Sequence, residues 1–413
     1  MWTIRAFHQL FSVGRHSDFT ILYAKIFFRA MMLSFGHFNR PLRAADVLKL
    51  KVVNMKLSTL FLLALIVVVP TISFTQSLEG GAEKSGALVT EYFNSAILRD
   101  NLVGLNARRS ISVYLPYGYH ESTRSYPVIY YFHNINWDNK RVFEENNVIP
   151  LLDRAISKGI IGDFILVVPD YSSPTMGSWY ENSSTSGRWL DYTISEVLPY
   201  VDSHFRTIRD RSSRGLAGDF LGGYGALKFA MLYPDTFGAV YALHPVGTGS
   251  GLMPTRSMVD WKRLHNAKSF ADLWADHYAP GFVAMSQGYL PNPKRPPFYC
   301  DFIVELEDGE PKFVPDNLRK LEARFHLDEL LREHADNLHK MRGIAFDWGR
   351  YDTTQGHVYA NQAFTRLLDQ LGIEHTAEEY NGGPYDKNWI EHGRVEANLL
   401  PFFSQHLVFD ETP

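Results

Sequence analysis

The chain has 413 residues, of which 45% are hydrophobic and 14% aromatic, so it holds enough large apolar side chains to build a sizeable core. Its formal net charge of -4 argues against a nucleic-acid-binding protein, because such domains are usually strongly basic. Cys300 is the only cysteine, which excludes an internal disulfide and a cysteine-based metal site, and we expect its thiol to be buried. His334 and His339 lack the spacing of a helical zinc site, and we expect neither a metal nor a cofactor.

Residues 55–76 carry the marks of a secretory signal peptide. The segment begins with Met55 and Lys56, continues in an apolar stretch of about ten residues and ends in small residues. That stretch is too short to span a bilayer comfortably, although an N-terminal membrane anchor is the alternative. We therefore expect a secreted or periplasmic protein whose mature chain, residues 77–413, has no stable membrane span. Residues 1–54 show no clear periodicity, and we interpret them as an upstream extension outside the folded protein.

The mature chain alternates short apolar runs with longer amphipathic ones, which is typical of βα units around a mostly parallel sheet. Val128–Phe132 and Phe164–Val168 are continuous apolar runs, as expected of strands buried on both faces. Arg109–Pro116 alternates polar and apolar residues, which predicts a strand near a sheet edge. Trp189–Phe205 has helical periodicity, and Pro199 is expected to disturb that helix locally. The remaining predicted elements are a helix at Tyr224–Met231, strands at Ala239–Leu243, Gly343–Asp347 and His375–Tyr380, and helices at Asn317–Lys340, Ala363–Leu371 and through Leu399–Phe403.

A more polar and irregular stretch, from about residue 248 to 340, separates two of these predicted strands. Its proline-rich part, residues 291–297, cannot lie inside a sheet, because proline has no N–H to donate to a neighbouring strand. We predict that this stretch is a lid-like insertion over the carboxyl end of the sheet. The mature chain is otherwise expected to form a single domain.

Several short motifs follow one another in the order of a known family. They are Val113–Pro116 with Tyr126–Tyr130, Glu196–Asp202, Ala217–Gly218 with Gly222–Leu227, Tyr233–Val240, Phe346–Gly349, and Tyr380–Gly383. Together they resemble the family described as "putative esterase", which includes esterase D, the feruloyl, acetylxylan and enterochelin esterases, and the mycolyltransferases. The resemblance covers roughly residues 109–403 and implies an α/β-hydrolase fold with a serine, histidine and acid triad for ester hydrolysis or acyl transfer.

The strongest motif has the glycine frame of a nucleophile elbow, but Phe220 stands where the family has its serine. A nucleophile held in that strained turn needs very small neighbours two residues away on each side, and Gly218 and Gly222 supply them. Asp219 is the alternative nucleophile, since a carboxylate can serve in principle. Moving the frame by one residue would, however, make the bulky Leu221 a neighbour of the apex.

The other catalytic positions implied by the resemblance are also altered. The histidine is expected after a Gly-Gly pair, where Pro384 stands, and proline cannot accept or relay a proton. His392 is the nearest alternative, although a surface histidine is the simpler interpretation. Asp352 occupies the position of the acid, or is merely a helix N-cap. The oxyanion-hole positions are Asn134, which replaces a glycine, and Leu221.

Five residues are expected to line the cleft and contact a ligand. Trp179 and Tyr180 follow the carboxyl end of a predicted strand, where open α/β sheets bind ligands, and their rings suit a sugar or an aromatic acid. Packing beneath the insertion is the alternative for both. His133, Asp219 and His244 are placed beside the elbow, with strand capping as the alternative for His244.

A serine triad needs a hydroxyl for attack and an imidazole to move the proton, and phenylalanine supplies neither. Loss of triad members leaves about 10³–10⁴-fold catalysis over water. We therefore favour a catalytically inactive esterase-like protein that binds a carbohydrate, an ester-bearing ligand or a protein partner. The alternative is an active ester hydrolase or acyltransferase that uses Asp219, His392 and Asp352. The sequence does not indicate an oligomeric state.

Overall fold

The computed structural model describes residues 85–249 and 258–409. The chain divides into two units, Met1–Glu79 and Gly80–Pro413, and every described residue lies in the second. The predicted upstream extension and signal peptide, residues 1–54 and 55–76, lie outside the described residues. Within the described residues, no helix has the length and apolar character needed to cross a bilayer.

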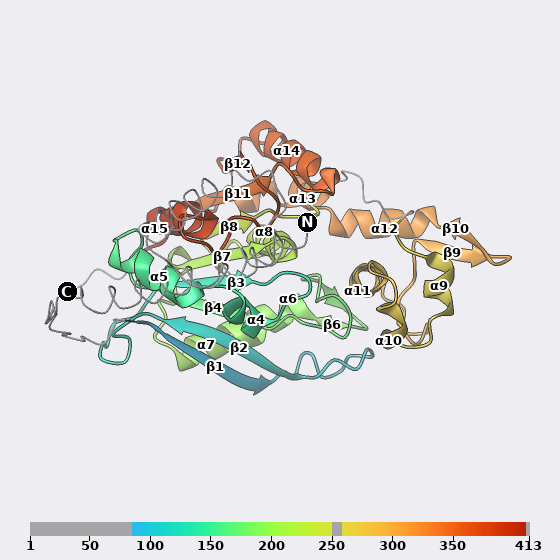
Figure 1. The fold of residues 1–413 in the computed structure, drawn as a ribbon, viewed down its shortest axis with the longest axis horizontal. Helices are drawn as coiled ribbons and strands as arrows, with labels where there is room; N and C mark the ends of the chain where they lie inside the picture. Colours follow the sequence, from blue (N-terminus) through green and yellow to red (C-terminus); the bar gives the residue numbers. More distant parts are fainter. Residues whose placement is uncertain (1–84, 250–257, 410–413) are drawn as a thin grey trace, which may run out of the picture. The chain divides into compact units, whose positions relative to one another are not determined.

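An eight-stranded sheet forms the centre of the second unit (Figure 1). Its strand order is β1-β2-β4-β3-β7-β8-β11-β12; β2 runs antiparallel to both β1 and β4, and all other neighbours are parallel. The predicted mostly parallel sheet is thus confirmed. The strands of this sheet are β1 (Ala87–Asn94), β2 (Arg108–Leu115), β3 (Val128–Phe132), β4 (Ile165–Pro169), β7 (Arg214–Asp219), β8 (Ala239–Leu243), β11 (Gly343–Gly349) and β12 (Thr376–Tyr380).

Helices cover both faces of this sheet. Every residue of β3, β4 and β8 is buried, as expected of apolar runs enclosed on two sides. One hydrophobic cluster contains the apolar residues of α7 and α8, and the other contains those of α5 and α15. The helices outside the insertion are α4 (Asn139–Glu144), α5 (Val148–Ser157), α6 (Trp189–Tyr192), η1 (Thr193–Val197), α7 (Leu198–His204), η2 (Arg211–Ser213), α8 (Leu221–Leu232), α14 (Gln355–Gln370), η3 (Val395–Leu399) and α15 (Leu400–His406), with a small β5–β6 hairpin (Asn182–Ser183, Gly187–Arg188).

Two predicted helices differ in their bounds: Asn317–Lys340 forms two helices, Pro315–Phe325 and Leu327–Leu338, and Ala363–Leu371 is longer than predicted. The helix expected at Ala363–Leu371 begins eight residues earlier, because Val358 and Ala360 are also buried against the core. This extension places the segment around His357 on a helix rather than in a loop. The local disturbance expected at Pro199 is present: the chain stays helical there, but the preceding turn widens to a π-helical one at η1, which accommodates the N–H that proline lacks.

Residues 244–342 connect two strands that lie side by side, β8 and β11. The stretch expected to be an insertion, about 248–340, falls within this connection. Figure 1 shows its elements from α9 to α12 grouped together beside the central sheet. They are α9 (Trp261–Asn266), α10 (Phe270–Leu273), α11 (Ala279–Tyr289), β9 (Val304–Glu307), β10 (Glu310–Phe313), α12 (Pro315–Phe325) and α13 (Leu327–Leu338).

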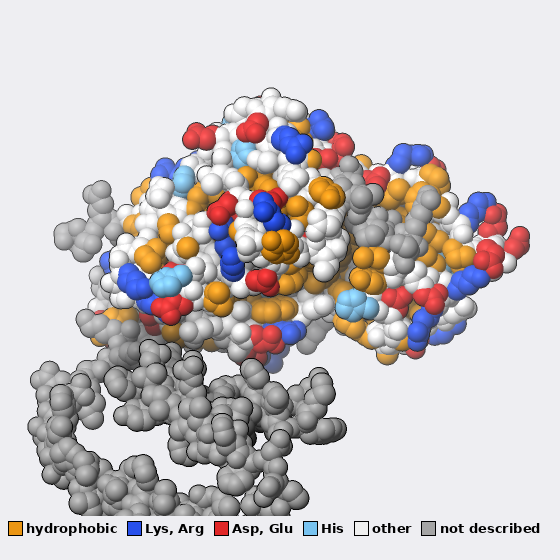
Figure 2. All heavy atoms as spheres, turned by 45° about the horizontal axis from the view of Figure 1, so that its top comes forward, with side chains coloured by type: hydrophobic (Ala, Val, Ile, Leu, Met, Phe, Trp, Pro, Cys, Tyr) orange, Lys and Arg blue, Asp and Glu red, His pale blue; other side chains and the backbone are white. Residues whose placement is uncertain are grey.

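A buried polar network joins this connection to the sheet. Lys228 of α8 donates from Nζ to Glu181 Oε2 at 2.5 Å, and both side chains are buried. The Tyr289 hydroxyl of α11 lies 3.4 Å from the same ammonium and 2.6 Å from the Tyr224 hydroxyl, and Arg324 of α12 donates to Glu181 Oε1. On the face drawn in Figure 2, charged side chains of both signs are interspersed with hydrophobic ones.

Candidate active site

Phe220 lies at the apex of a sharp turn between β7 and α8. Its backbone has φ 54° and ψ −109°, a conformation that is costly for a bulky residue. A Cβ built on Gly222 would lie 1.9 Å from the Phe132 carbonyl oxygen, and one on Gly218 would lie 2.4 Å from the Gly222 carbonyl carbon. Both clashes involve backbone atoms, so only glycine fits at either position. The elbow geometry is therefore complete, with a phenylalanine at its tip.

Three rings surround Phe220, which is itself half-buried. The His357 ring meets it edge to face with centroids 5.4 Å apart, and the His244 ring stacks on it at 6.0 Å. The Tyr385 ring is tilted at 5.4 Å and is 47% exposed. The place where a serine hydroxyl would act is thus an aromatic cluster with one open side.

Asp352 lies beyond the end of β11 and is enclosed by hydrogen-bond donors. Its Oδ2 lies 3.0 Å from His244 Nε2 and 2.8 Å from His357 Nδ1, and its Oδ1 accepts the Thr354 N–H at 2.7 Å. Burial alone would raise the pKa of this carboxyl, but the hydrogen bonds from His244 and His357 outweigh burial and hold the pKa well below its usual range. Asp352 is therefore a carboxylate that anchors two imidazoles.

The hydrogen bonds of His244 fix its tautomer. Its Nδ1 accepts the Gly349 backbone N–H at 2.9 Å, so this nitrogen carries a lone pair. The proton of the neutral ring is then on Nε2, which donates to Asp352. His244, Asp352 and His357 place three ligand-type atoms within 4.8 Å of one another, as a metal site would. A metal, however, would need the Nε2 lone pair that this tautomer does not have, so the group fits a hydrogen-bonded cluster better.

His357 was not singled out from the sequence, because its segment was not predicted to be helical. It lies in the first turn of α14, whose side-chain direction brings it over the elbow. Because Asp352 is an acceptor, His357 donates from Nδ1 and retains its lone pair on Nε2. Its side chain is 24% exposed, so solvent can reach it. A histidine five residues after the expected acid is the signal that could have identified it.

The position expected for the family histidine lies in the loop after β12. Pro384 occupies it, and its carbonyl, like that of Gly383, accepts the Tyr380 hydroxyl, at 3.2 Å and 2.8 Å. The Gly383 N–H donates to Asp386 Oδ2. The loop is therefore closed by its own hydrogen bonds, and the side chain it directs towards Phe220 is the Tyr385 ring.

The two expected oxyanion-hole positions are brought to the same edge of the sheet. Leu221 is the first residue of α8, and Asn134 lies two residues after the end of β3. The last residue of β3, Phe132, packs against Gly222 of α8. Within residues 85–249 and 258–409, neither the Asn134 nor the Leu221 backbone N–H donates to a hydrogen bond. A helix N-terminus with unpaired N–H groups suits a developing negative charge.

All five expected ligand contacts are buried, and His133, Trp179 and Tyr180 are held by contacts within the fold. His133 Nε2 accepts the Tyr171 N–H at 2.8 Å and its Nδ1 donates to the Asn134 carbonyl, so both nitrogens are occupied. Burial also lowers the pKa of His133, which keeps the ring neutral. Trp179 packs on Phe325 of the insertion, and Tyr180, 1% exposed, donates to the His133 carbonyl. For Trp179 this arrangement supports packing beneath the insertion rather than ligand stacking, whereas Tyr180 packs instead against Phe132 and Tyr171.

Asp219 and His392, the alternative catalytic groups, are not brought together. Asp219 is buried, and burial raises its pKa to about 7 against an opposing hydrogen bond from Tyr131. The His392 side chain is 76% exposed, and its ring nitrogens lie 4.0 Å from Glu391 Oε1 and 3.9 Å from Glu396 Oε2. Among the described residues, no hydrogen bond or ion pair within 4.0 Å joins Asp219 to His392. The geometric condition for that alternative is not met.

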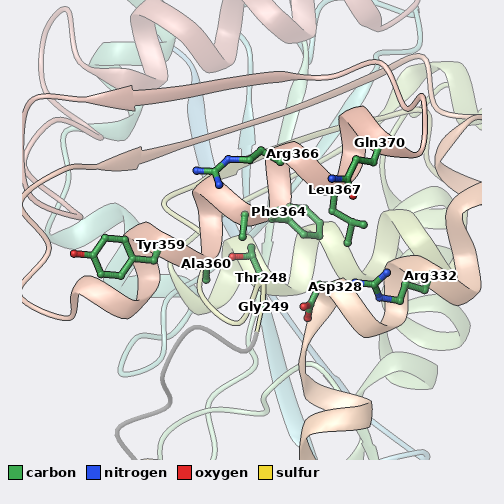
Figure 3. A pocket seen from close by; sticks show the side chains of 11 residues that line it. Thr248, Gly249, Asp328, Arg332, Tyr359, Ala360, Phe364, Arg366, Leu367 and Gln370 are labelled. Atoms are coloured by element: carbon green, nitrogen blue, oxygen red, sulfur yellow. The ribbon is translucent and has the colours of Figure 1, made fainter.

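A separate pocket of about 530 Å³ lies between α13, α14 and the loop after β8 (Figure 3). Its lining includes Asp328, Arg332 and Arg366, and neither Phe220 nor Asp352 is part of it. It is therefore distinct from the elbow.

Comparison with known proteins agrees with this geometry. The model of the family described as "Putative esterase" matches residues 103–291. The chain is 32% identical over 161 residues to an esterase of Mycobacterium tuberculosis (strain CDC 1551 / Oshkosh), covering 38% of this chain and 33% of the relative. It is 27% identical over 139 residues to an endo-1,4-beta-xylanase/feruloyl esterase of Xylanibacter ruminicola, covering 32% of this chain and 18% of the relative. The chain thus spans about a third or less of the length of these two relatives.

Solved structures show the same fold. A ferulic acid esterase superposes with a TM-score of 0.54 at 18% identity, covering 78% of this chain and 98% of its own. An S-formylglutathione hydrolase from Agrobacterium tumefaciens superposes with a TM-score of 0.51 at 14% identity, covering 79% and 97%. The family model thus covers residues 103–291, less than half of the chain, and the described residues share the α/β-hydrolase fold of these esterase structures.

Proposed function

We propose that this protein is a non-catalytic member of the esterase family that binds a carbohydrate or an ester-bearing ligand at the surface around Phe220. The observation that carries the proposal is the phenylalanine at the elbow apex. An acyl-enzyme requires a nucleophilic oxygen at that point, and a phenyl ring has none. The oxyanion positions and binding alone would leave about 10³–10⁴-fold acceleration over water.

The aromatic cluster supports the choice of ligand. Phe220 is half-buried, Tyr385 is 47% exposed and His357 is 24% exposed, so a flat ligand can reach their faces. Aromatic faces bind sugar rings and aromatic acids, because both offer flat apolar surface with polar edges. Two relatives carry feruloyl or ferulic acid esterase in their names, and a feruloylated saccharide combines both ligand types.

Kinetics and binding test this proposal separately. With p-nitrophenyl acetate and methyl ferulate, we expect no burst and a rate indistinguishable from that of Phe220→Ala. In isothermal titration calorimetry with feruloylated xylo-oligosaccharides, Phe220→Ala should weaken binding about tenfold, which corresponds to roughly 1–2 kcal/mol of aromatic contact. Tyr278→Ala, at an exposed tyrosine of the insertion, is the control and should bind normally. Rapid ester cleavage that disappears in Asp352→Ala would refute the inactive assignment.

Secretion is the second part of the proposal and rests on the signal-peptide pattern of residues 55–76. Expression of the full chain in a secreting host should release a protein whose N-terminal sequence begins near residue 77. A cell-associated product that retains Met55 would contradict it.

A further inference from the structure

We infer that His357 has taken over the role of the missing family histidine, so that a serine at position 220 would by itself complete a Ser–His–Asp triad. This goes beyond the proposed function, in which Phe220 accounts for the absence of catalysis and His357 is only part of the ligand-binding surface. The sequence suggests two losses, at Phe220 and Pro384. The structure places a second histidine against the same carboxylate.

The hydrogen bonds give His357 the form that a catalytic histidine needs. Asp352 accepts its Nδ1–H at 2.8 Å, and the lone pair remains on Nε2. In a serine triad the acid holds Nδ1–H in the same way, and Nε2 takes the proton of the serine hydroxyl. No hydrogen bond among the described residues engages Nε2 of His357, so this nitrogen is available.

The topology explains why a residue of α14 can reach the elbow. β7, β8 and β11 are consecutive parallel strands of the sheet, so their carboxyl ends meet at one edge. Phe220 follows β7, and the loop carrying Asp352 follows β11. The first turn of α14 comes directly after that loop, and its His357 ring lies 5.4 Å from the Phe220 ring.

His244 acts as a positioning residue in this arrangement. The Gly349 N–H holds its Nδ1 and its Nε2–H donates to Asp352, so it fixes the carboxylate from the opposite side. Its side chain is 1% exposed and cannot itself meet a substrate in solution. The base is therefore His357, and His244 orients the acid that serves it.

The chemistry available to a Phe220→Ser variant follows from these positions. The serine Oγ would attack the ester carbonyl carbon while its proton passes to His357 Nε2, and the Asn134 and Leu221 N–H groups would face the oxyanion. Collapse breaks the ester C–O bond, and the leaving p-nitrophenol takes the proton from His357 Nε2, which leaves an acyl-serine and a neutral imidazole. Water then attacks the acyl carbon while it loses a proton to the same nitrogen, and that proton returns to the serine Oγ as acetate leaves.

The experiment compares four variants of the full chain: Phe220→Ser, and the same substitution combined with His357→Ala, His392→Ala or Pro384→His. With p-nitrophenyl acetate we expect Phe220→Ser to show a burst and to be about 10²–10⁴-fold faster than Phe220→Ser/His357→Ala. A fluorophosphonate probe should label residue 220, as detected by mass spectrometry. Addition of imidazole should restore part of the activity of the His357→Ala double variant, which a purely structural role would not allow. The His392→Ala double variant is the matched control and should equal Phe220→Ser, because that histidine is on the surface.

Two results would overturn the inference. The first is a folded Phe220→Ser protein that is inactive and unlabelled, or that becomes active only with Pro384→His. The second is activity that is unchanged by His357→Ala. If Phe220→Ser does not fold, the native protein still tests the idea by ¹⁵N NMR of the imidazoles. We expect His357 protonated on Nδ1 and His244 on Nε2, and a His357 ring protonated on Nε2 would refute the assignment. A burst in the native protein would instead refute only the proposed function.

Discussion

Asp219 should make the stability of this protein depend on pH in a direction opposite to that of most carboxylates. Its side chain is buried beside the elbow, and burial raises its pKa from 3.8 to about 7. Between these values the folded state holds a proton that the unfolded state has released, so folding becomes less favourable as pH rises. About 3 pKa units at roughly 1.4 kcal/mol each amount to about 4 kcal/mol, which is fully lost once the pH exceeds the folded pKa.

Asp219→Asn removes the titration while nearly preserving the shape of the side chain. Urea unfolding of both proteins at pH 4 to 8 should therefore give a stability difference that moves by about 4 kcal/mol in favour of the variant as pH rises. Using the difference cancels the other titrating groups that both proteins share. Asp369→Asn, at an exposed residue of α14, is the control, and its difference should not move by this amount. If the stability difference between Asp219→Asn and the native protein does not change with pH, this carboxyl ionises as easily in the folded protein as in the unfolded chain, and the reasoning is wrong.

Two further predictions concern packing. Gly222→Ala should lower the free energy of unfolding by at least about 3 kcal/mol or prevent folding, because its Cβ would lie 1.9 Å from the Phe132 carbonyl oxygen. Gly288→Ala is the control: its Cβ has contacts only at 3.8 Å and beyond, so the thermal midpoint should stay nearly unchanged or rise. Lys228→Met should lower the free energy of unfolding by about 3–5 kcal/mol, because it leaves the Glu181 carboxylate buried without its closest cation. Adding Glu181→Gln should recover part of this loss. If chemical denaturation shows no recovery in the double variant, this account of the pair is contradicted.

The elbow could be predicted from the sequence because its cause is local. Gly218 and Gly222 are required by contacts within a few residues and with the end of β3, and any chain with this turn meets the same steric limits. The buried strands were equally accessible, since a continuous apolar run at Val128–Phe132 has few other places to lie. Local causes leave local patterns in the sequence.

The histidine at the site could not be predicted in this way. The segment around His357 has no strong helical pattern, and its helix forms because Val358 and Phe364 are buried by the rest of the fold. The placement of Trp179 depended likewise on the insertion, whose Phe325 packs against its ring, and that of Tyr180 on Phe132 and Tyr171. Each of these placements is set by contacts between segments far apart in the chain, which residue spacing does not encode.

The persistence of the strained turn says less about function than the group around Asp352 does. The glycine packing that forces φ 54° at Phe220 belongs to the β7–α8 connection and would remain whatever residue stood at the apex. Packing the sheet, in contrast, does not require a buried carboxylate that accepts two imidazoles. A buried ion of this kind costs desolvation energy, and an apolar side chain of similar size could fill the space at lower cost. Such a group is kept where its proton chemistry or hydrogen bonding is used, which makes Asp352 and His357, rather than the elbow, the part of this site to test first.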